Sequence, residues 1–244
     1  MPDLLILRFD APLIAFGGII VDERGVTRAF PARAMLAGML GNALGYDHRD
    51  AGRLQALQVR LRFAVRCDRP GQLWADYQTV DLSQKFLARG WTTRGKFEAR
   101  AGGSARIGTH IRLRSFIADA VYTLALTLAE IGQRPSLGEL EAALREPARP
   151  LFIGRKPCLP STPLLAGRAA APTLLQALEA HPLARRAARG DPIRAWWPAD
   201  EDLGREGSRL ISITDDRDWR NQIHVGRRWI HEGTINVHTP TVDD

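Results

Sequence analysis

The chain has 244 residues, of which 45% are apolar, and it carries a net charge of +7 at pH 7. This length and composition indicate a globular protein with one large domain or two small ones. No stretch approaches the ~20 apolar residues that span a membrane, and the first residues do not form a secretion signal, so we expect a cytoplasmic protein. The two cysteines, Cys67 and Cys158, are too few and too far apart for a disulfide framework or a zinc motif, and we expect both to be reduced and packed.

The positive charge is concentrated in one stretch, residues 82–114. This stretch contains eight basic residues and one acidic residue, so its excess equals the net charge of the whole chain, +7. A solvated basic face is the usual explanation of a charge run, but an arginine-rich concentration of this size favours a nucleic-acid partner. The basic residues are Lys85, Arg89, Arg94, Lys96, Arg100, Arg106, Arg112 and Arg114.

In chain order, the first predicted element is a strand. Leu4–Phe9 (LLILRF) is a short apolar run with the length of a buried strand. Ala11–Arg28 contains a proline and a Gly-Gly pair, which predicts a long loop. Phe30–Tyr46 (FPARAMLAGMLGNALGY) predicts a helix, because its apolar residues recur at helical spacing and Pro31 suits the first helical position.

A second stripe on this helix consists only of small residues, Ala34, Gly38, Gly41 and Gly45. Each glycine inside a helix costs roughly 0.8–1 kcal/mol relative to alanine, so something must lie close against the stripe. Two neighbours fit: a packed strand, which is the commoner case, or the backbone of a ligand. Arg33 lies in the first turn, where exposed N–H groups and the helix dipole favour an anion such as phosphate.

The next segments predict more strands and an arm. Arg53–Gln58 predicts a short helical continuation, and Val59–Cys67 (VRLRFAVRC) alternates in a way that predicts a strand with one buried and one basic face. Leu73–Val80 predicts another strand. The basic stretch that follows contains Trp91 and Phe97 but has no helical or strand period, so we interpret it as an arm, formed by a long hairpin. Interleaved aromatic and arginine side chains suit base stacking and phosphate contact.

A further strand, helix and strand complete the first part of the chain. Ser115–Leu128 alternates again and predicts one long strand. Ser136–Glu146 predicts a helix with a capping box, formed by its first serine and the glutamate three residues later. Leu151–Ile153 predicts a short strand that ends at a glycine.

The order of these elements predicts an α+β fold. We expect a ferredoxin-like (RRM-like) βαββαβ domain over residues 1–154, with a basic thumb insertion over residues 81–114. Residues 155–244 are richer in proline at first and predict a smaller β-rich C-terminal domain. Ferredoxin-like sheets commonly present an open face to RNA, although a fold alone does not decide function. Within the C-terminal part, Thr173–Arg189 predicts a helix, Arg209–Thr214 and Gln222–Arg228 predict strands, and Val237–Asp244 is expected to fray.

Several separated motifs, in one order, resemble the Cas-five family of CRISPR-associated proteins, in the form found in type I-E Cascade complexes. The resemblance covers about Leu4–Gly167, and DDRDWRNQIHVGRRW resembles the last hairpin of the family. Several motifs in order are much harder to obtain by chance than one short pattern. The motifs are FPARAMLAGMLGNALGY, LQALQ, RFAVRCD, DYQTV, RSFIADAVYTLAL and FIGRKPC.

The resemblance implies a non-catalytic subunit of the RAMP superfamily that binds the 5′ handle of crRNA and caps one end of the backbone filament, in antiviral defence. The implied partners are crRNA, the backbone Cas-seven and large Cas-eight subunits and, through the complex, target DNA; no membrane and no cofactor is implied. Arg33 falls at the arginine of the F-P-x-R helix start, and Arg114 at the arginine before the D-A strand. Gly154, Arg155 and Lys156 fall on the G-R-R loop. Lys156 replaces the second arginine there, which keeps the charge but loses a planar fork.

The insertion matches the family by position and charge. Basic side chains of the insertion can bind phosphates through their charge, and its aromatic side chains can bind bases by stacking. As a group they are assigned to RNA binding: Lys85, Arg89, Trp91, Arg94, Lys96, Arg100, Arg106, His110 and Arg112.

A second hypothesis is a metal-independent endoribonuclease that processes CRISPR repeat RNA, as some relatives in other CRISPR subtypes do. That reaction needs a base for the 2′-hydroxyl and an acid for the leaving oxygen. No recognisable spacing groups the candidate residues, and type I-E systems use a separate processing subunit, so we expect no catalysis. The candidates are Tyr46, His48, Tyr77, Lys85, Lys96 and His110.

No metal or cofactor motif is present in the sequence. His231–Glu232 lacks the second histidine of a helical zinc motif. Asp215, Asp216 and Asp218 are of the type that holds Mg²⁺, but they fall in an expected turn, for which solvation is the commoner explanation. We expect Trp196–Trp197 to pack rather than to stack on bases, with a partner contact as the alternative.

Overall fold

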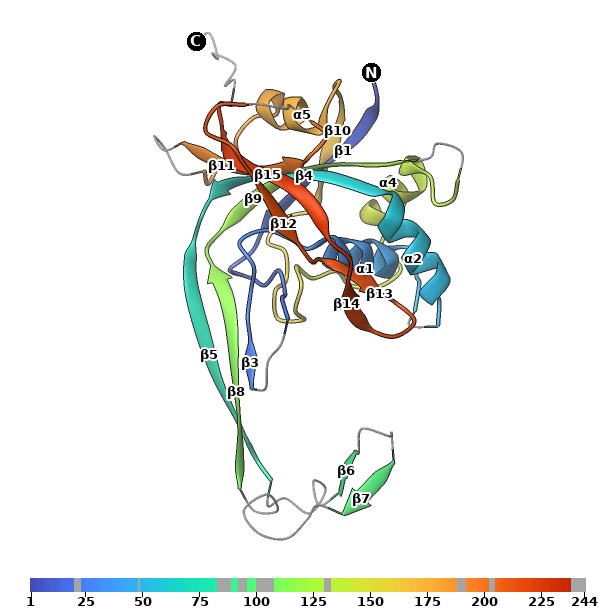
Figure 1. Ribbon diagram of the computed structural model, residues 1–244, viewed down its shortest axis with the longest axis vertical. Coiled ribbons are helices and arrows are strands. Elements are labelled where there is room, and N and C mark those ends of the chain that lie inside the picture. Colours follow the sequence, from blue (N-terminus) through green and yellow to red (C-terminus); the bar gives the residue numbers. More distant parts are fainter. Residues whose placement is uncertain are drawn as a thin grey trace.

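Figure 1 shows a body of sheet and helices from which a long arm extends. The computed structural model describes residues 1–19, 23–47, 49–82, 89–91, 96–99, 108–129, 133–187, 192–201 and 205–237. The fold is mixed α+β with several sheets. The main sheet has seven strands in the order β10-β1-β9-β4-β11-β15-β12, and all its neighbours are antiparallel. These strands are β1 (Asp3–Asp10), β4 (Leu61–Arg69), β9 (Val121–Leu128), β10 (Leu165–Ala170), β11 (Ile193–Pro198), β12 (Arg209–Ile213) and β15 (Arg228–Ile235).

Helices cover both faces of the main sheet. One face packs against α1 (Arg33–Ala43), α2 (Ala51–Arg60) and α4 (Leu137–Arg145), and the other against α5 (Leu174–Ala180). The strand predicted at residues 4–9 lies within β1 and is confirmed. Its consecutive apolar residues are all buried because they point alternately into the two cores.

The predicted capping box is confirmed at the start of α4. The Ser136 side chain accepts a hydrogen bond from the Glu139 N–H, and the Glu139 carboxylate accepts one from the Ser136 N–H. Both contacts satisfy N–H groups that would otherwise have no partner at the helix start.

Helix α1 is shorter than predicted at both ends. It begins at Arg33 after the N-cap Ala32, so the expected role of Pro31 as first helical residue is wrong. After its last residue the chain turns through Gly45, which has a φ of +82°. The Gly45 N–H donates to the Asn42 carbonyl at 3.2 Å, and the next N–H donates to Gly41 at 2.8 Å, which is a Schellman motif. Gly45 therefore ends the helix rather than lying within it.

Gly38 and Gly41 of the small-residue stripe on α1 pack against side chains, so the commoner expected neighbour, a packed strand, is wrong for them. A β-carbon on Gly38 would lie 3.2 Å from the Trp219 ring, and one on Gly41 would lie 2.4 Å from a Leu54 methyl group. Leu54 belongs to α2, and Trp219 lies in the turn of a separate hairpin. The strands of that hairpin are β13 (Asp216–Asp218) and β14 (Ile223–Val225).

Strand β4 is buried along most of both faces, and the predicted basic face is wrong for Arg66, whereas Arg62 is partly exposed. Arg66 is fully buried beneath α5 and forms an ion pair with Asp68, with Nε 2.6 Å from Oδ1. The carbonyls of His181 and Pro182, which follow α5, accept from the same guanidinium at 2.7 and 3.0 Å. A charge can lie inside the protein here because its hydrogen-bonding groups are satisfied.

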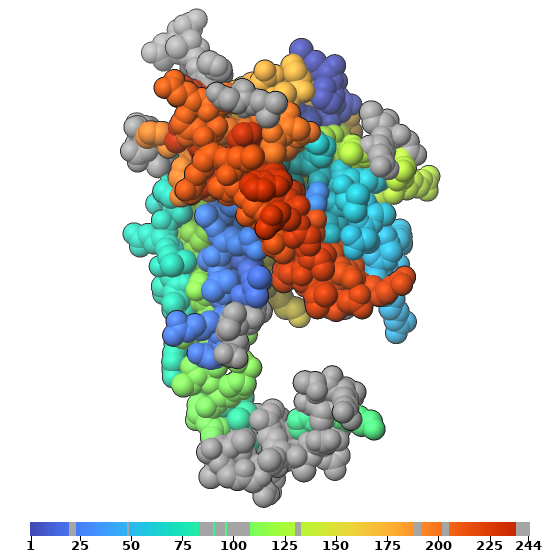
Figure 2. Space-filling model, viewed as in Figure 1, coloured from blue at the N-terminus to red at the C-terminus, as the bar shows by residue number. Residues whose placement is uncertain are grey.

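The arm is an antiparallel pair of long strands, β5 and β8, and Figure 2 shows it projecting from the body. The short strands β2 and β3 also pair with β8. The single strand predicted over residues 115–128 is wrong, because the chain turns at Asp119, where φ is +59°, and divides it between β8 and β9. The bounds are β2 (Leu13–Ile14), β3 (Arg24–Gly25), β5 (Gln72–Asp81) and β8 (Thr109–Ala118).

The strand predicted at residues 151–153, as the last of the βαββαβ order, is wrong. Residues 151–153 do not form a strand, because prolines stand close on both sides and the Ile153 N–H donates to the Cys158 carbonyl at 2.8 Å in a local turn. Strand β10 pairs with β1 instead. Strands β11, β15 and β12 extend the same sheet beyond β4, so the predicted domain division at residue 154 does not coincide with a break in the sheet.

The C-terminal elements are shorter than predicted. The helix expected at residues 173–189 is only α5, which starts after the N-cap Thr173 and ends before Pro182. The strand predicted at residues 209–214 is β12, whereas residues 222–228 divide between β14 and the start of β15. Residues 238–244, where fraying was predicted, lie outside the described part of the chain.

The remaining predictions about packing are confirmed. Trp196 and Trp197 are 3% and 1% exposed and belong to the two different cores. Cys67 and Cys158 are free and buried. None of the helices in the described ranges is long and apolar enough to cross a membrane.

Candidate nucleic-acid interface

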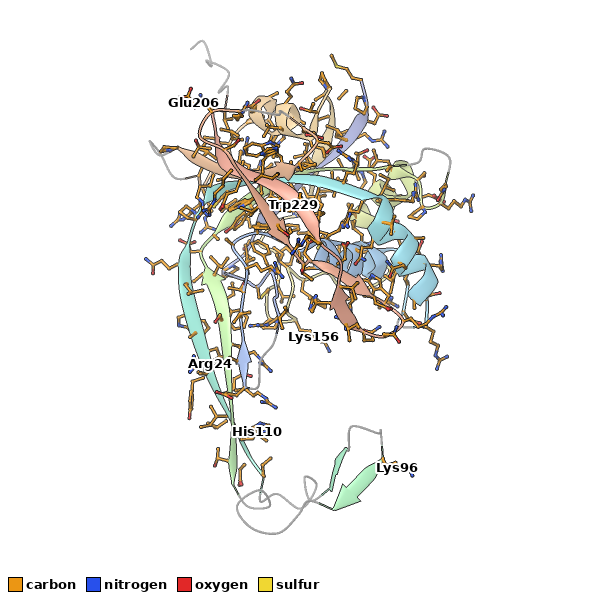
Figure 3. The ribbon with its side chains drawn as sticks, in the orientation of Figure 1. Arg24, Lys96, His110, Lys156, Glu206 and Trp229 are labelled. Carbon is orange, nitrogen blue, oxygen red and sulfur yellow. The ribbon has the colours of Figure 1, made fainter. Side chains whose placement is uncertain are left out.

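One face of the arm carries a row of basic side chains. In β8, His110, Arg112 and Arg114 alternate with Ile111 and Leu113, so the first three share a face. Figure 3 shows His110 on the arm, well away from the body. The row therefore runs along the arm and ends where β8 meets the body, an arrangement that suits a phosphate backbone.

At the base of the arm, Arg114 and Arg155 bring two guanidinium groups together beside Gly25. A β-carbon on Gly25 would lie 2.7 Å from Arg114 Nη1 and 2.9 Å from Arg155 Nη2. Arg155 donates to the carbonyls of Ser115 and Gly25, each at 2.9 Å, and lies 5.0 Å from the centroid of the Phe116 ring. Arg114 Nη1 is buried and has no hydrogen-bond partner.

The electrostatics of this pair favour an anion. Burial is the main cause that lowers the pKa of the Arg155 guanidinium, and the neighbouring charge of Arg114 lowers that pKa further. The Arg155 guanidinium remains protonated at neutral pH because an arginine does not lose its proton in proteins. Two like charges side by side, one with an unused donor, would be stabilised by a phosphate between or beside them.

Gly154 brings the loop that carries Arg155 close to the strands. Its φ is +94°, and a β-carbon would lie 1.6 Å from the Ala15 carbonyl oxygen, so only glycine fits. Lys156 is exposed, on the side of the body from which the arm extends (Figure 3). The structure thus brings together four predicted site residues, Arg114, Gly154, Arg155 and Lys156.

Arg33, which was also predicted to bind RNA, is engaged within the chain. Its guanidinium forms a two-point ion pair with Asp216, in which Nε lies 2.5 Å from Oδ1. Its backbone N–H donates to the Asp215 carboxylate at 2.9 Å. The anion at the N-terminus of α1 is therefore Asp215 of this chain, where the sequence suggested a phosphate.

Asp215 is buried, so the expectation of a solvated turn is wrong for this residue. Its carboxylate accepts from Arg228 Nε at 3.1 Å and Nη2 at 2.5 Å, besides the contact from Arg33. Burial alone raises the pKa of this carboxyl, but the hydrogen bonds and charge of Arg228, with the Arg33 N–H, outweigh burial and hold the pKa below its ordinary value. These contacts join the start of α1 to the C-terminal hairpin.

The end of the arm is described in part. Strands β6 (Arg89–Trp91) and β7 (Phe97–Ala99) pair with each other, and Lys96 is exposed beside them (Figure 3). Four further residues predicted in the insertion lie outside the described residues. For two others the backbone is described but the side chain is not. The four are Lys85, Arg94, Arg100 and Arg106, and the two are Arg89 and Trp91.

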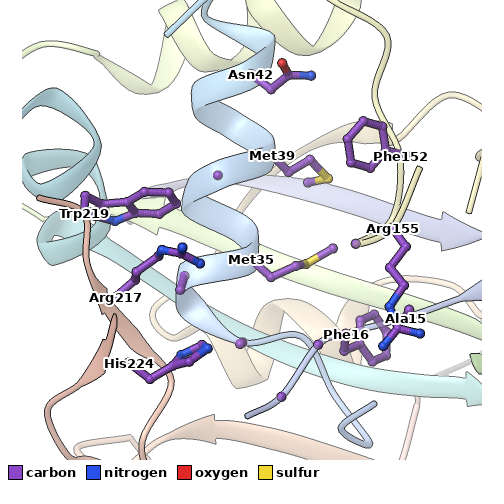
Figure 4. A pocket seen from close by; sticks show the side chains of 16 residues that line it. Ala15, Phe16, Met35, Met39, Asn42, Phe152, Arg155, Arg217, Trp219 and His224 are labelled. Atoms are coloured by element: carbon purple, nitrogen blue, oxygen red, sulfur yellow. The ribbon is translucent and has the colours of Figure 1, made fainter. Parts of the chain in front are cut away.

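A cavity that the sequence did not predict lies on the outer face of α1. The cavity has a volume of about 360 Å³ and lies between the β13–β14 hairpin and the loops around Gly17 and Gly154 (Figure 4). Its walls combine apolar groups with the basic side chains of Arg155, Arg217 and His224. The signal was present in the segment DRDWRNQIH, which mixes basic and aromatic residues outside the basic stretch, but its position beside α1 is visible only in the fold.

The candidates for an RNA-cleaving base do not form a cluster among the described residues. Tyr46 is buried just beyond the end of α1, whereas Tyr77 and His110 lie on opposite faces of the arm. His48 and Lys85 are outside the described ranges. In the part of the chain that the structure describes, no group of three or more His, Cys, Asp or Glu residues could hold a metal ion.

Comparison with known proteins identifies the family. The family described as CRISPR-associated protein (Cas_Cas5) matches residues 4–231. The CRISPR system Cascade subunit CasD of Escherichia coli (strain K12) is 34% identical over 167 residues, which are 68% of this chain and 71% of that protein. Among solved structures, a chain of a CRISPR RNA-guided surveillance complex has a TM-score of 0.67 at 25% identity, covering 96% of this chain and 90% of that chain. A structure described as a crystal structure of Cas protein has a TM-score of 0.64 at 25% identity, covering 96% and 95%. The resemblance found in the sequence is confirmed, and the chain belongs to the Cas-five family of CRISPR-associated proteins.

Proposed function

We propose that this chain is the CasD subunit of a type I-E CRISPR surveillance complex. In that complex it binds the 5′ handle of crRNA and caps one end of the backbone filament, and it catalyses no reaction. Family membership supports this role, because the relative from Escherichia coli is a Cascade subunit and a matching structure belongs to an RNA-guided surveillance complex. The partners are crRNA, the backbone Cas-seven subunits and the large Cas-eight subunit, and target DNA is met through the complex.

The observation that carries RNA binding is the pair of guanidinium groups at the base of the arm. Arg114 has a buried donor without a partner, and Arg155 is held beside it by backbone carbonyls. An RNA phosphate would accept from both groups and offset their mutual repulsion. From this point the basic face of β8 continues along the arm, so a single strand of RNA has a basic path that begins at the body.

We also assign a ferredoxin-like core to the body. In chain order its strands are β1, β4, β9 and β10, and in space they lie as β10-β1-β9-β4, all antiparallel. A helical segment separates the first two strands and another separates the last two. This order supports the βαββαβ assignment, with the arm as a thumb between the second and third strands.

The test uses the full chain and labelled CRISPR repeat RNA in the presence of EDTA, scored for a shifted band and for a cut band. We expect a shifted band without cleavage, and an affinity that falls linearly in a plot of log K against log salt concentration. A discrete cut at one position would contradict the non-catalytic role in favour of the endoribonuclease. Failure to shift the RNA at low salt would contradict RNA binding itself.

A further inference from the structure

The cavity on α1 has an apolar floor with an aromatic ring at one side. Met35 lies on the helix face that borders the cavity, and Phe152 lines the cavity from the loop before Gly154 (Figure 4). On the other side, the Trp219 ring lies so close to Gly38 that a β-carbon there would be 3.2 Å from it. Aromatic rings such as those of Phe152 and Trp219 are surfaces on which nucleic-acid bases stack, and Met35 adds apolar contact area between them.

The polar groups of the cavity are mainly donors. Among the described residues that line it, every charged side chain is basic. Arg217 Nε is buried and has no hydrogen-bond partner, although Nη2 of the same side chain donates to Gln222 at 2.6 Å. An unpaired buried donor is costly, so a ligand that brings acceptor atoms to Arg217 would be favoured.

The one carboxamide in the cavity wall is already engaged. Asn42 Nδ2 donates to the Pro150 carbonyl at 2.9 Å, and Asn42 Oδ1 accepts from Arg149 Nε at 2.7 Å. An acceptor for Arg217 Nε must therefore come with the ligand. Ring nitrogens and carbonyl oxygens of a base, and the oxygens of its phosphate, are such acceptors.

The size and position of the cavity connect it to the RNA path. Its volume of about 360 Å³ lies in the usual range of ~300–1,000 Å³ for small-molecule pockets. Arg155 takes part in both places, since it lines the cavity and also stands beside Arg114 at the base of the arm. A nucleotide whose phosphate contacts Arg155 therefore has its base within reach of the cavity.

We propose that this cavity receives one unpaired base of the bound RNA, which rests on Met35 and accepts from Arg217 while its phosphate contacts Arg155. The inference depends on the proposed function and adds to it, because the guanidinium pair binds only the backbone, whereas an inserted base contributes stacking. Recognition of single-stranded RNA commonly uses bases that leave the stack in this way.

The test combines a scan of the RNA with variants of the protein. The full chain is titrated with labelled RNA that carries the 5′ handle, in which each nucleotide in turn is replaced by an abasic one. We expect one position at which the loss of the base weakens binding about tenfold. In Met35→Ala and in Arg217→Gln this penalty should disappear, because the base no longer has its site.

Two matched controls lie outside the cavity. Arg220→Gln removes an exposed arginine from the same hairpin, and Leu210→Ala removes an exposed apolar side chain from β12. Both should keep the position-dependent penalty. If Met35→Ala disturbs the fold, as judged by its thermal unfolding, the Arg217→Gln variant decides.

The outcomes separate this inference from the proposed function. Normal RNA binding without a position-dependent penalty, or with a penalty that both variants retain, would overturn the base site and leave the proposed function standing. If the unsubstituted chain bound no handle RNA, the proposed function and the base site would both be wrong.

Discussion

Single residues decide where the charge of this protein is available to a ligand. Arg33 and Arg155 were both assigned to RNA from the sequence, yet the structure gives them different surroundings. Arg33 faces the carboxylates of Asp215 and Asp216, which neutralise it. Arg155 faces backbone carbonyls and another arginine, so its positive charge has no counterion among the contacts described above. The second kind of arginine is the one that gains most from a phosphate.

Replacing Arg155 by glutamine should therefore weaken binding of the handle RNA by roughly tenfold or more, because a charged hydrogen bond is lost. The slope of log K against log salt concentration should fall by about 1, since one phosphate contact is removed. Equilibrium binding at several salt concentrations measures both.

The matched control is Arg185→Gln, which removes an exposed arginine that follows α5. It should change affinity by less than about twofold. Equal losses from the two substitutions would show that binding follows total charge rather than this site.

At the scale of elements, the sequence predicted those features that depend on neighbours along the chain. The capping box of α4 and the strand β1 follow from local pattern, and both are confirmed. The pattern could not show what covers an element. The alternation in β4 indicated a solvated basic face, but α5, from more than one hundred residues later in the chain, covers it and encloses Arg66.

The periodic pattern of apolar residues also could not predict where an element ends at a turn. The alternation of residues 115–128 is continuous through Asp119, so nothing in its period marks the place where the chain leaves the arm for the main sheet. Likewise, Gly45 matches the small-residue stripe of α1 by spacing, although it serves as the left-handed residue that ends the helix.

The contact of α5 with the sheet depends on the ion pair inside it. Asp68→Asn should lower the free energy of unfolding by about 3–5 kcal/mol, because it leaves Arg66 buried without its counterion. The control is Asp200→Asn, which breaks an ion pair of Arg62 with an aspartate whose side chain is 64% exposed. It should cost about 1 kcal/mol or less. Urea unfolding of both variants measures the difference, and equal costs would contradict the assigned role of the buried pair.

The same region makes stability depend on pH. Burial lowers the pKa of His181, and the charges of Arg8 and Arg66 lower it further below the ordinary value of 6.5. Below pH 6.5 the unfolded chain therefore binds a proton at His181 more readily than the folded chain does. The free energy of unfolding keeps its full value above this pH and decreases as the pH falls toward the lowered pKa of the folded chain.

His181→Gln should reduce this loss of stability on acidification, as measured by urea unfolding at about pH 7.5 and about pH 5.5. His224→Gln replaces an exposed histidine of the C-terminal hairpin and should leave the loss unchanged. If both variants retained the full loss, the titrating group would lie elsewhere.

For the whole molecule, we expect the arm and the body to make separate contributions to RNA binding. Family resemblance assigned both, and the structure brings the loop at Gly154 and the base of β8 together, although they lie far apart in the sequence. The cavity on α1 was not predicted, because its walls come from the start, the middle and the end of the chain. No local pattern reports such a meeting of distant segments.

Shortening the arm tests how much of the RNA affinity comes from the arm and how much from the body. The ladder of the arm closes where the Leu82 N–H donates to the Gly108 carbonyl at 3.1 Å, so an Asn-Gly turn can replace residues 83–107. The shortened chain should keep its thermal unfolding midpoint within a few degrees, because the main sheet is untouched. It loses six of the eight basic residues of the stretch, so its affinity and its salt slope should both fall.

Retention of full affinity after this deletion would assign RNA binding to the body alone. A large drop in the unfolding midpoint would instead show that the end of the arm contributes to the stability of the fold. Arg155→Gln in the shortened chain should lower the salt slope by about one further unit, as in the full chain.

The position of β11 also bears on how the protein is made. Strand β4 is an interior strand only because β11 pairs with it at residues 65 and 66, and β11 is followed in the sheet by β15 and β12. During translation, β1, β4, β9 and β10 are synthesised before β11. The edge of β4 that pairs with β11 therefore has no partner strand until the ribosome has released Pro198, the last residue of β11. During that interval the nascent chain presents an open strand edge, the feature that recruits other chains into aggregates. A message that stops before β11 would therefore yield an insoluble product even though it encodes four of the seven strands of the sheet.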